Sequence, residues 1–215
     1  MVVFIIYILA AYFIGSIPTA IWYGRIFHKT DIRKHGSGNA GATNTIRTFG
    51  KKAGILVLII DITKGSVGVL LPWMVSFITD NPDLQIQLDS IQHPQLALGL
   101  AAGLGHIYPI YERFRGGKGV ATLFGVILAI DLWVALCTVV SFVILFIITK
   151  RVSVGSIISG VAFAVAFIIM NKSMMPADYI LVCVFPLLII YTHRSNIKRL
   201  MNGTEPRLSL GKKKD

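Results

Sequence analysis

The sequence predicts an all-helical integral membrane protein with seven transmembrane helices. Apolar residues make up 54% of the 215 positions and charged residues only 14%, and the mean hydropathy is +0.71. The apolar residues fall in long runs that are nearly free of charge, as expected of spans that need about 20 residues to cross roughly 30 Å of hydrocarbon. The Lys and Arg residues, in contrast, are concentrated between these runs.

The predicted spans are 2–24, 53–78, 95–110, 119–131, 132–149, 154–171 and 178–192. The stretch 119–149 would form either one helix of about 46 Å or two short spans. A single crossing would place Lys118 and Lys150 on opposite faces of the membrane, whereas a hairpin with Asp131 at its tip keeps both on one face. We therefore expect the hairpin. Its first helix is too short for a full bilayer and must sit within protein or thinned membrane.

The charge distribution predicts the orientation of the chain. Four segments hold 19 of the 21 Lys and Arg residues, namely 25–52, 111–118, 150–153 and 193–215. The connection 79–94 carries three Asp residues and no Lys or Arg. Because cationic loops remain in the cytoplasm, we expect the N-terminus outside and the C-terminus inside. The net charge of +11 is thus explained by topology and contact with lipid headgroups, and nucleic acid is not an expected partner.

The first polar segment of interest reads Gly-Ser-Gly-Asn-Ala-Gly-Ala-Thr-Asn at 36–44. Glycines allow positive φ, and successive backbone N–H groups in such turns form an anion-binding concavity. Hydroxyl and amide side chains add neutral donors, and Arg47 adds a cation suited to phosphate. The candidate binding residues are Gly36, Ser37, Gly38, Asn39, Gly41, Thr43, Asn44 and Arg47. A plain loop whose hydroxyls cap the next helix is the alternative.

The second polar segment joins Gly-His-Ile-Tyr-Pro at 105–109 to Arg-Gly-Gly-Lys-Gly at 115–119. Gly116, Gly117 and Lys118 precede a predicted span, and a lysine beside backbone N–H groups at a helix N-terminus is a natural anion site. The segment is not a nucleotide-binding P-loop, since Glu112 stands where that motif has Gly. His106 is either a general base or a structural hydrogen bonder.

Further polar residues lie in the other two basic segments. His193 and Asn196 are one helical turn apart, and Ser153 follows Lys150 and Arg151. Arg194, Lys198 and Arg199 can be ordinary flanking charges. Asp61 and Lys64, inside the second span, form an intramembrane pair that is either functional or a structural anchor.

Several catalytic patterns do not occur in the sequence. We find no clustered carboxylates or His/Cys sets typical of a catalytic metal and no G-x-S-x-G nucleophile motif. No cofactor is therefore expected. None of the five histidines has an Asp five residues later, so the H-x4-D pattern of common glycerolipid acyltransferases is absent.

The polar segments together resemble one family. G-S-G-N-A-G-A-T-N at 36–44, F-R-G-G-K-G-V-A-T at 114–122 and T-H-R-S-N-I at 192–197 are similar to motifs of bacterial acyl-phosphate-dependent glycerol-3-phosphate acyltransferases. The resemblance implies a multi-pass inner-membrane enzyme with a cytoplasmic active site. Such an enzyme transfers a fatty acyl group from acyl phosphate to the 1-hydroxyl of sn-glycerol 3-phosphate, forming lysophosphatidic acid. It also implies an upstream enzyme that forms acyl phosphate as a partner.

The resemblance also implies roles for individual residues. Ser37, Asn39 and Thr43 would bind the acyl-phosphate headgroup, with Asn44 supporting the loop. Arg47, Lys118 and Ser153 would hold glycerol phosphate. His193 and Asn196 would orient the attacking hydroxyl, whose proton passes to His193 or to a substrate phosphate oxygen. The alternative function is a transporter for a phosphorylated metabolite, which is disfavoured because the polar residues gather on one face and no internal repeat is found.

Overall fold

The computed structural model describes residues 2–81 and 93–208, which form helices joined by loops, and no strand occurs there. The helices are α1 (Val2–Gly15), α2 (Thr19–His28), α3 (Ala42–Phe49), α4 (Lys51–Thr79), α6 (Pro94–Ile107), α7 (Val120–Ile130), α8 (Leu132–Thr149), α9 (Val152–Met170), α10 (Pro176–Thr192) and α11 (Arg194–Met201), with 3₁₀ turns at Ile32–Lys34 and Ile110–Glu112. Most of the predicted acidic connection and the last basic residues of the tail lie outside the described residues.

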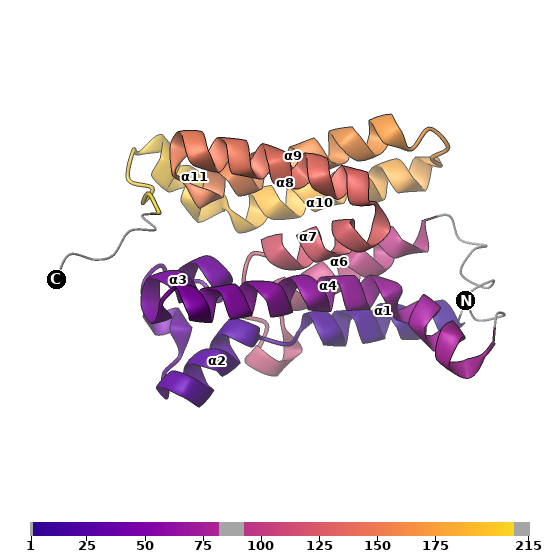
Figure 1. Ribbon diagram of the computed structural model, residues 1–215, viewed down its shortest axis with the longest axis horizontal. Coiled ribbons are helices and arrows are strands. Elements are labelled where there is room, and N and C mark those ends of the chain that lie inside the picture. Colours follow the sequence, from indigo (N-terminus) through magenta and orange to yellow (C-terminus); the bar gives the residue numbers. More distant parts are fainter. Residues whose placement is uncertain (1, 82–92, 209–215) are drawn as a thin grey trace.

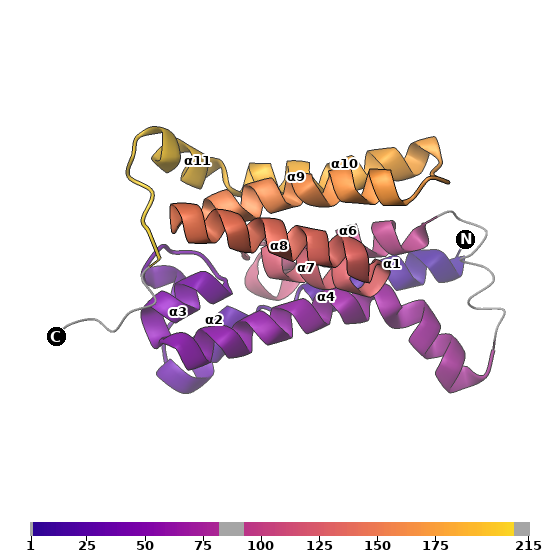
Figure 2. The same ribbon diagram turned by 45° about the horizontal axis from the view of Figure 1, so that its top comes forward.

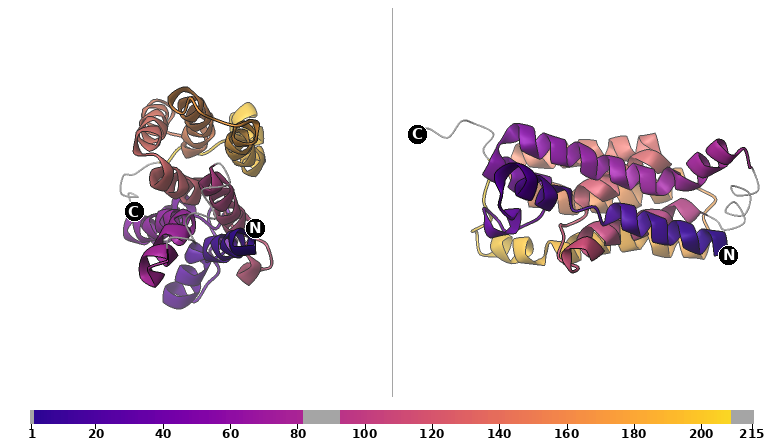
Figure 3. Two further views of the ribbon diagram at one scale, coloured as in Figure 1. Left: turned by 90° about the vertical axis from the view of Figure 1, so that its right-hand side faces the viewer. Right: turned by 90° about the horizontal axis from the view of Figure 1, so that it is seen from below.

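The long helices form an elongated bundle in which α8, α9 and α10 stack over α1 and α4, with α6 and α7 between them (Figures 1 and 2). The end-on view separates the same two groups (Figure 3). The short helices α2, α3 and α11 lie together at one end of the long axis (Figure 1). The described parts of two segments predicted to be basic and cytoplasmic, 25–52 and 193–215, therefore lie at the same end of the molecule.

The first predicted span, 2–24, lies within the apolar helical segment Val2–His28, which is interrupted between α1 and α2. Helix α1 ends at Gly15 and α2 begins at Thr19. Pro18 cannot donate a backbone hydrogen bond and disfavours helical backbone in the residue before it. Lys64 Nζ donates to the carbonyl of Ile17 at 2.7 Å and lies 2.9 Å from Asp61 Oδ1. The intramembrane pair thus stabilises the break in the first span, which supports its structural interpretation.

The hairpin predicted at 119–149 is present as the two helices α7 and α8. Asp131 separates them and accepts hydrogen bonds from the N–H groups of Trp133 and Val134 at 2.8 and 3.0 Å. This N-cap ends one helix and starts the next. Helix α7, with 11 residues, is only about 16 Å long.

Close packing of small residues holds α7 against α4. A Cβ atom on Gly65 would lie 2.0 Å from the carbonyl oxygen of Thr122, and one on Gly125 would lie 1.9 Å from that of Ile62. Such backbone approach is typical of helices in lipid, where small residues allow close contact. Large aromatic side chains fill the space on the other side of α7, where Phe163, Phe167 and Phe185 are almost completely buried.

The number of membrane crossings is only partly fixed by helix length. Among the described residues, four helical segments are long and apolar enough to cross a membrane, and a fifth arises if α10 and α11, bent by 59°, count as one span. The other predicted spans, now α6 and α7, have 14 and 11 residues. The structure is therefore that of a multi-pass membrane protein with short helices enclosed by longer ones.

Candidate functional site

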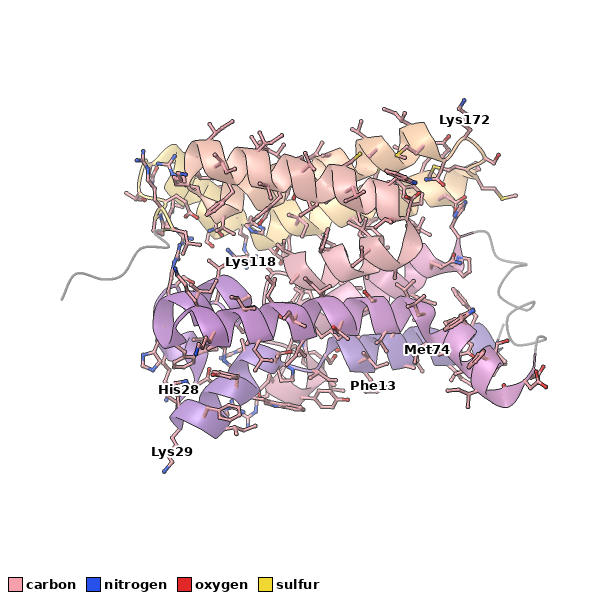
Figure 4. The ribbon with its side chains drawn as sticks, viewed as in Figure 1. Phe13, His28, Lys29, Met74, Lys118 and Lys172 are labelled. Atoms are coloured by element: carbon pink, nitrogen blue, oxygen red, sulfur yellow. The ribbon has the colours of Figure 1, made fainter. Side chains whose placement is uncertain are left out.

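A cavity of about 840 Å³ contains most of the polar residues singled out from the sequence. Its lining includes Ser37, Gly38, Asn39, Gly41, Thr43, Asn44, Arg47, His106, Gly116, Gly117, Lys118, Ser153, His193 and Asn196. Among the predicted residues, Gly36 does not line it. Lys118 lies between the two groups of helices and projects toward the end that carries α3 and α11 (Figure 4). Segments far apart in the sequence thus meet around one space.

The first loop is organised by Asn44, whose side chain is almost completely buried. Its Nδ2 atom lies within 3.2 Å of three carbonyl oxygens, those of Ile32, His35 and Asn39, and its Oδ1 accepts the backbone N–H of Ser37 at 2.8 Å. One amide side chain therefore replaces the regular backbone hydrogen bonds that this irregular loop lacks. Asn44 supports the loop, which leaves Ser37, Asn39 and Thr43 to face the cavity.

Gly36 is required by this arrangement although it does not line the cavity. Its φ is +58°, and a Cβ atom there would lie 2.3 Å from Asn44 Oδ1. Both the left-handed backbone and the contact exclude a side chain. The predicted glycine therefore acts on the shape of the loop.

The second loop folds back on the end of α6. The backbone N–H groups of Gly116 and Gly117 donate to the carbonyl oxygens of Ile107 and His106, each at 3.1 Å. These two N–H groups are thus already used within the protein. A Cβ atom at either glycine would collide with His106, so the two glycines allow the close approach that brings Lys118 to the cavity.

His106 is part of a buried polar cluster at the inner wall of the cavity. Its Nδ1 lies 3.1 Å from Thr122 Oγ1 and 3.6 Å from Asp61 Oδ1, and Asp61 also accepts the hydroxyl of Thr19 at 3.0 Å. His106 and Asp61 both contribute to the lining. Asp61 was assigned no binding role from the sequence, and its contacts join the wall of the cavity to the break in the first span.

Lys118 begins a chain of polar contacts that links four segments. Lys118 Nζ donates to Asn196 Oδ1, and Asn196 Nδ2 donates to Glu205 Oε1 at 2.7 Å. The same oxygen accepts the hydroxyl of Ser153 at 2.7 Å, and Arg199 Nε donates to the other carboxylate oxygen at 2.8 Å. Thr192 Oγ1 also donates to the Lys118 carbonyl oxygen at 3.1 Å. Glu205 therefore fixes the relative positions of predicted residues from three different segments.

The electrostatics of this cluster favour a site for an anion. Burial lowers the pKa of Lys118 to about 8, while the nearby Glu205 carboxylate opposes this shift and Arg199 and Arg47 add to it. Burial raises the pKa of Glu205, but hydrogen bonds from Asn196, Ser153 and Arg199 outweigh it and hold the pKa below its ordinary value. The Glu205 carboxylate balances the positive charge of the buried Lys118 only in part, so a bound phosphate would stabilise the protonated form of Lys118.

His193 is buried at the junction of α10 and α11. Its Nδ1 lies 2.7 Å from the carbonyl oxygen of Ile189. A carbonyl can only accept, so Nδ1 carries the proton and Nε2 keeps its lone pair in the neutral ring. His193 can thus accept a hydrogen bond or a proton from a hydroxyl bound in the cavity.

Two important residues were not given roles from the sequence. Glu205 was assigned no role from the sequence, and Arg199 was interpreted as an ordinary flanking charge, yet both take part in the hydrogen-bond cluster around Asn196. The one available signal was a lone carboxylate after a run of cationic residues, because an isolated acid near basic residues often pairs with them.

Among the described residues, no group of three or more His, Cys, Asp or Glu is arranged to hold a metal ion.

Much of the remaining cavity wall is apolar. It includes the side chains Leu58, Ile62, Leu123, Phe124, Val139, Phe142, Phe163 and Phe185. The cavity thus combines a cationic end with an apolar interior, as an amphipathic ligand with an anionic head requires.

Comparison with known proteins identifies the family. The model of the glycerol-3-phosphate acyltransferase family matches residues 5–203. Glycerol-3-phosphate acyltransferases of Bacillus cytotoxicus and Enterococcus faecalis are 45% and 41% identical over 213 and 214 residues, covering 98% and 96% of this chain and 98% and 93% of theirs. Two crystal structures of PlsY (YgiH), an integral membrane glycerol 3-phosphate acyltransferase, are also similar. The glycerol 3-phosphate form has 33% identity and a TM-score of 0.80, and the lysophosphatidic acid form has 32% and 0.79, each covering 96% of both chains. The chain therefore belongs to the glycerol-3-phosphate acyltransferase family of membrane enzymes, which confirms the resemblance found in its motifs.

Proposed function

We propose that the chain transfers a fatty acyl group from acyl phosphate to the 1-hydroxyl of sn-glycerol 3-phosphate. The products are lysophosphatidic acid and inorganic phosphate. The observation that carries this proposal is the cavity itself, in which Lys118 and Arg47 lie at one end of an otherwise largely apolar wall. A cavity of this kind suits two phosphates and one acyl chain at once.

The acceptor is held by Lys118, Arg47 and Ser153. The two cations provide the charge that a phosphate dianion requires, and Arg47 can donate two parallel hydrogen bonds. The Ser153 hydroxyl donates to Glu205, so its oxygen meets the ligand as an acceptor for the hydroxyls of the glycerol unit.

The donor headgroup lies on the first loop. Ser37, Asn39 and Thr43 line the cavity and supply hydroxyl and amide donors, while Gly38 and Gly41 let the backbone approach the phosphate. The acyl chain extends along the apolar wall, where Phe124 and Phe142 bound the space. Burial of each methylene contributes about 0.8 kcal/mol.

The reaction needs positioning and charge stabilisation more than covalent participation by the protein. The glycerol oxygen attacks the acyl carbon and forms the ester bond, and the bond from that carbon to the phosphate oxygen breaks as inorganic phosphate leaves. His193 and Asn196 orient the attacking hydroxyl, whose proton passes to His193 Nε2 or to a substrate phosphate oxygen. Lys118 stabilises the charge that develops during transfer.

We further propose that the protein crosses the cell's inner membrane seven times, with its N-terminus outside. The polar end of the cavity then faces the cytoplasm. The positive-inside distribution supports this orientation. Lys29 and Lys172 lie at opposite ends of the molecule (Figure 4). In a variant with Cys137 and Cys183 replaced by Ala, a membrane-impermeant maleimide on intact spheroplasts should label Lys172→Cys but not Lys29→Cys. The opposite labelling pattern would contradict the orientation.

The site assignment is tested with purified protein, acyl phosphate and glycerol 3-phosphate. Lys118→Ala should abolish formation of lysophosphatidic acid, while Lys172→Ala, a lysine at the far end, should retain wild-type activity. Both variants should give the same thermal unfolding midpoint in detergent. Full activity of Lys118→Ala would refute the assignment of the site.

A further inference from the structure

A second cavity, of about 880 Å³, lies beside the reaction site and is lined by residues of two polar segments. Its lining comes from residues 25–38, before α3, and from residues 111–116, before α7. The two loops belong to the segments whose positive charge predicts a cytoplasmic location.

A network of four ionic side chains holds these two loops together. Glu112, which is buried, accepts two hydrogen bonds from Arg25 at 2.6 and 2.9 Å and one from Arg33 at 3.0 Å. Asp31 lies 3.1 Å from Arg25 and 2.6 Å from Arg33. Arg33 Nη1 also donates to the carbonyl oxygen of Arg115 at 2.9 Å. Two carboxylates thus neutralise two arginines and join the first loop to the second.

The other cations of this cavity are not neutralised. Lys34, Arg113 and Arg115 also line it, and all three are exposed. Within the described part of the chain, none of the three has a carboxylate within ion-pair distance. The wall therefore carries an excess of three positive charges, directed at a space that a small anion can enter.

The two cavities share part of their lining. Gly38, Arg115 and Gly116 border both the second cavity and the reaction site. Gly38 has a φ of +72° and no side chain, and Gly116 presents only backbone. The boundary between the cavities is therefore formed by the two loops that also carry the phosphate-binding residues.

We propose that the second cavity is a cationic vestibule, lined by Lys34, Arg113 and Arg115, that concentrates a small water-soluble phosphate monoester dianion and delivers it to Lys118. The inference rests on the proposed function, in which that dianion is glycerol 3-phosphate. The acyl donor is anchored in the bilayer and reaches the apolar part of the reaction site, whereas the acceptor comes from water and needs a separate polar route. A surplus of positive charge at a cleft raises both the local concentration and the association rate of an anion.

The test compares two double variants in the full-length protein. Lys34→Gln/Arg113→Gln removes two vestibule cations that do not line the reaction site. The matched control, Lys29→Gln/Lys52→Gln, removes two cations from the same end that line neither cavity. Lys29 and Arg113 both have left-handed backbone, with φ of 51° and 52°, so each double variant places one glutamine at the same kind of backbone position. Lys29 points away from the protein in Figure 4.

At about 0.01 M ionic strength, where screening acts over about 30 Å, the vestibule variant should lose about fivefold in kcat/KM for glycerol 3-phosphate. Its kcat at saturating glycerol 3-phosphate should equal that of the wild type, and the control variant should lose less than twofold. At about 1 M salt, where screening acts within about 3 Å, the difference should vanish.

Equal losses in the two variants would overturn the vestibule, because the effect would then belong to the general surface charge. A loss that persists at high salt, or a fall in kcat, would also overturn it, because the side chains would then act through the shape of the site. Failure of the proposed function is a separate result, in which the wild type itself forms no lysophosphatidic acid.

Discussion

The Glu205 carboxylate should set the pH range of the enzyme through Lys118, although no role was assigned to it from the sequence. It accepts hydrogen bonds from Ser153, Asn196 and Arg199 at 2.7 to 2.8 Å, and its charge opposes the lowering of the Lys118 pKa. We therefore take Glu205→Gln as the perturbation. The substitution keeps the size of the side chain and removes the charge.

Two effects are expected from Glu205→Gln. Each hydrogen bond to a charged group contributes about 1.5–3 kcal/mol, and loss of one such interaction in the transition state lowers kcat/KM by about 10- to 100-fold. The pKa of Lys118 should also fall. Since only the protonated amine binds phosphate, the decline of activity at alkaline pH, near 8 in the wild type, should begin at lower pH.

A second substitution reverses the sign of the pH effect. The Arg199 guanidinium lowers the pKa of Lys118, so Arg199→Gln should move the alkaline decline to higher pH even if its kcat/KM is reduced. The assay is kcat/KM for glycerol 3-phosphate between pH 6.5 and 9.5, a profile that reports the free enzyme. Shifts in the same direction for both variants, or no shift in either, would refute the electrostatic link between Glu205 and Lys118.

Other substitutions test the structural parts of the account. Gly36→Ala should destabilise the protein and abolish activity, because the Cβ atom would lie 2.3 Å from Asn44 Oδ1. Gly203→Ala has a similar φ of +70° but nothing within 4 Å, so it should lower the stability by only about 1–2 kcal/mol. Thermal unfolding in detergent compares the two variants, and equal effects would contradict the role of Gly36. Asn44→Asp should lower the stability of the protein by at least about 2 kcal/mol, since a carboxylate would face three carbonyl oxygens. If this variant were as stable as the wild type, the loop would not depend on the Asn44 amide. Gly125→Ala should separate α7 from α4 and reduce the folded yield, because its Cβ atom would lie 1.9 Å from the carbonyl oxygen of Ile62. Gly160→Ala should be tolerated better, because its Cβ atom would lie 3.6 Å from Ile189, an ordinary contact. The reverse order in fluorescence-detected size exclusion would argue against the packing of α4 on α7.

Local sequence signals predicted much of the fold. Asp131 in a long apolar run indicated a hairpin, and its side chain does cap α8. The sequence did not indicate the break at Pro18, because a proline inside a span is often tolerated as a kink. What makes it a break is Lys64, which donates to the carbonyl of Ile17 and lies 47 positions away. Such a contact has no signature in local periodicity.

The candidate site shows the same distinction. Short sequence motifs were enough to predict binding or catalytic roles for the glycine-rich loops, Lys118 and His193, because residue type and spacing indicate their chemistry. Glu205, in contrast, acts through Asn196 and Ser153, and Glu112 binds Arg25 across 87 positions. These carboxylates acquire their roles only when distant segments pack together, so composition alone could not assign them.

The central claim is direct acyl transfer from acyl phosphate to glycerol 3-phosphate in one cavity. The most direct measurement is the stoichiometry of products from purified wild-type protein in EDTA, with acyl phosphate, acyl-CoA or acyl carrier protein thioester offered separately. The account predicts equal amounts of lysophosphatidic acid and inorganic phosphate from acyl phosphate, with both products absent when glycerol 3-phosphate is omitted. Formation of lysophosphatidic acid from a thioester donor but not from acyl phosphate would contradict it.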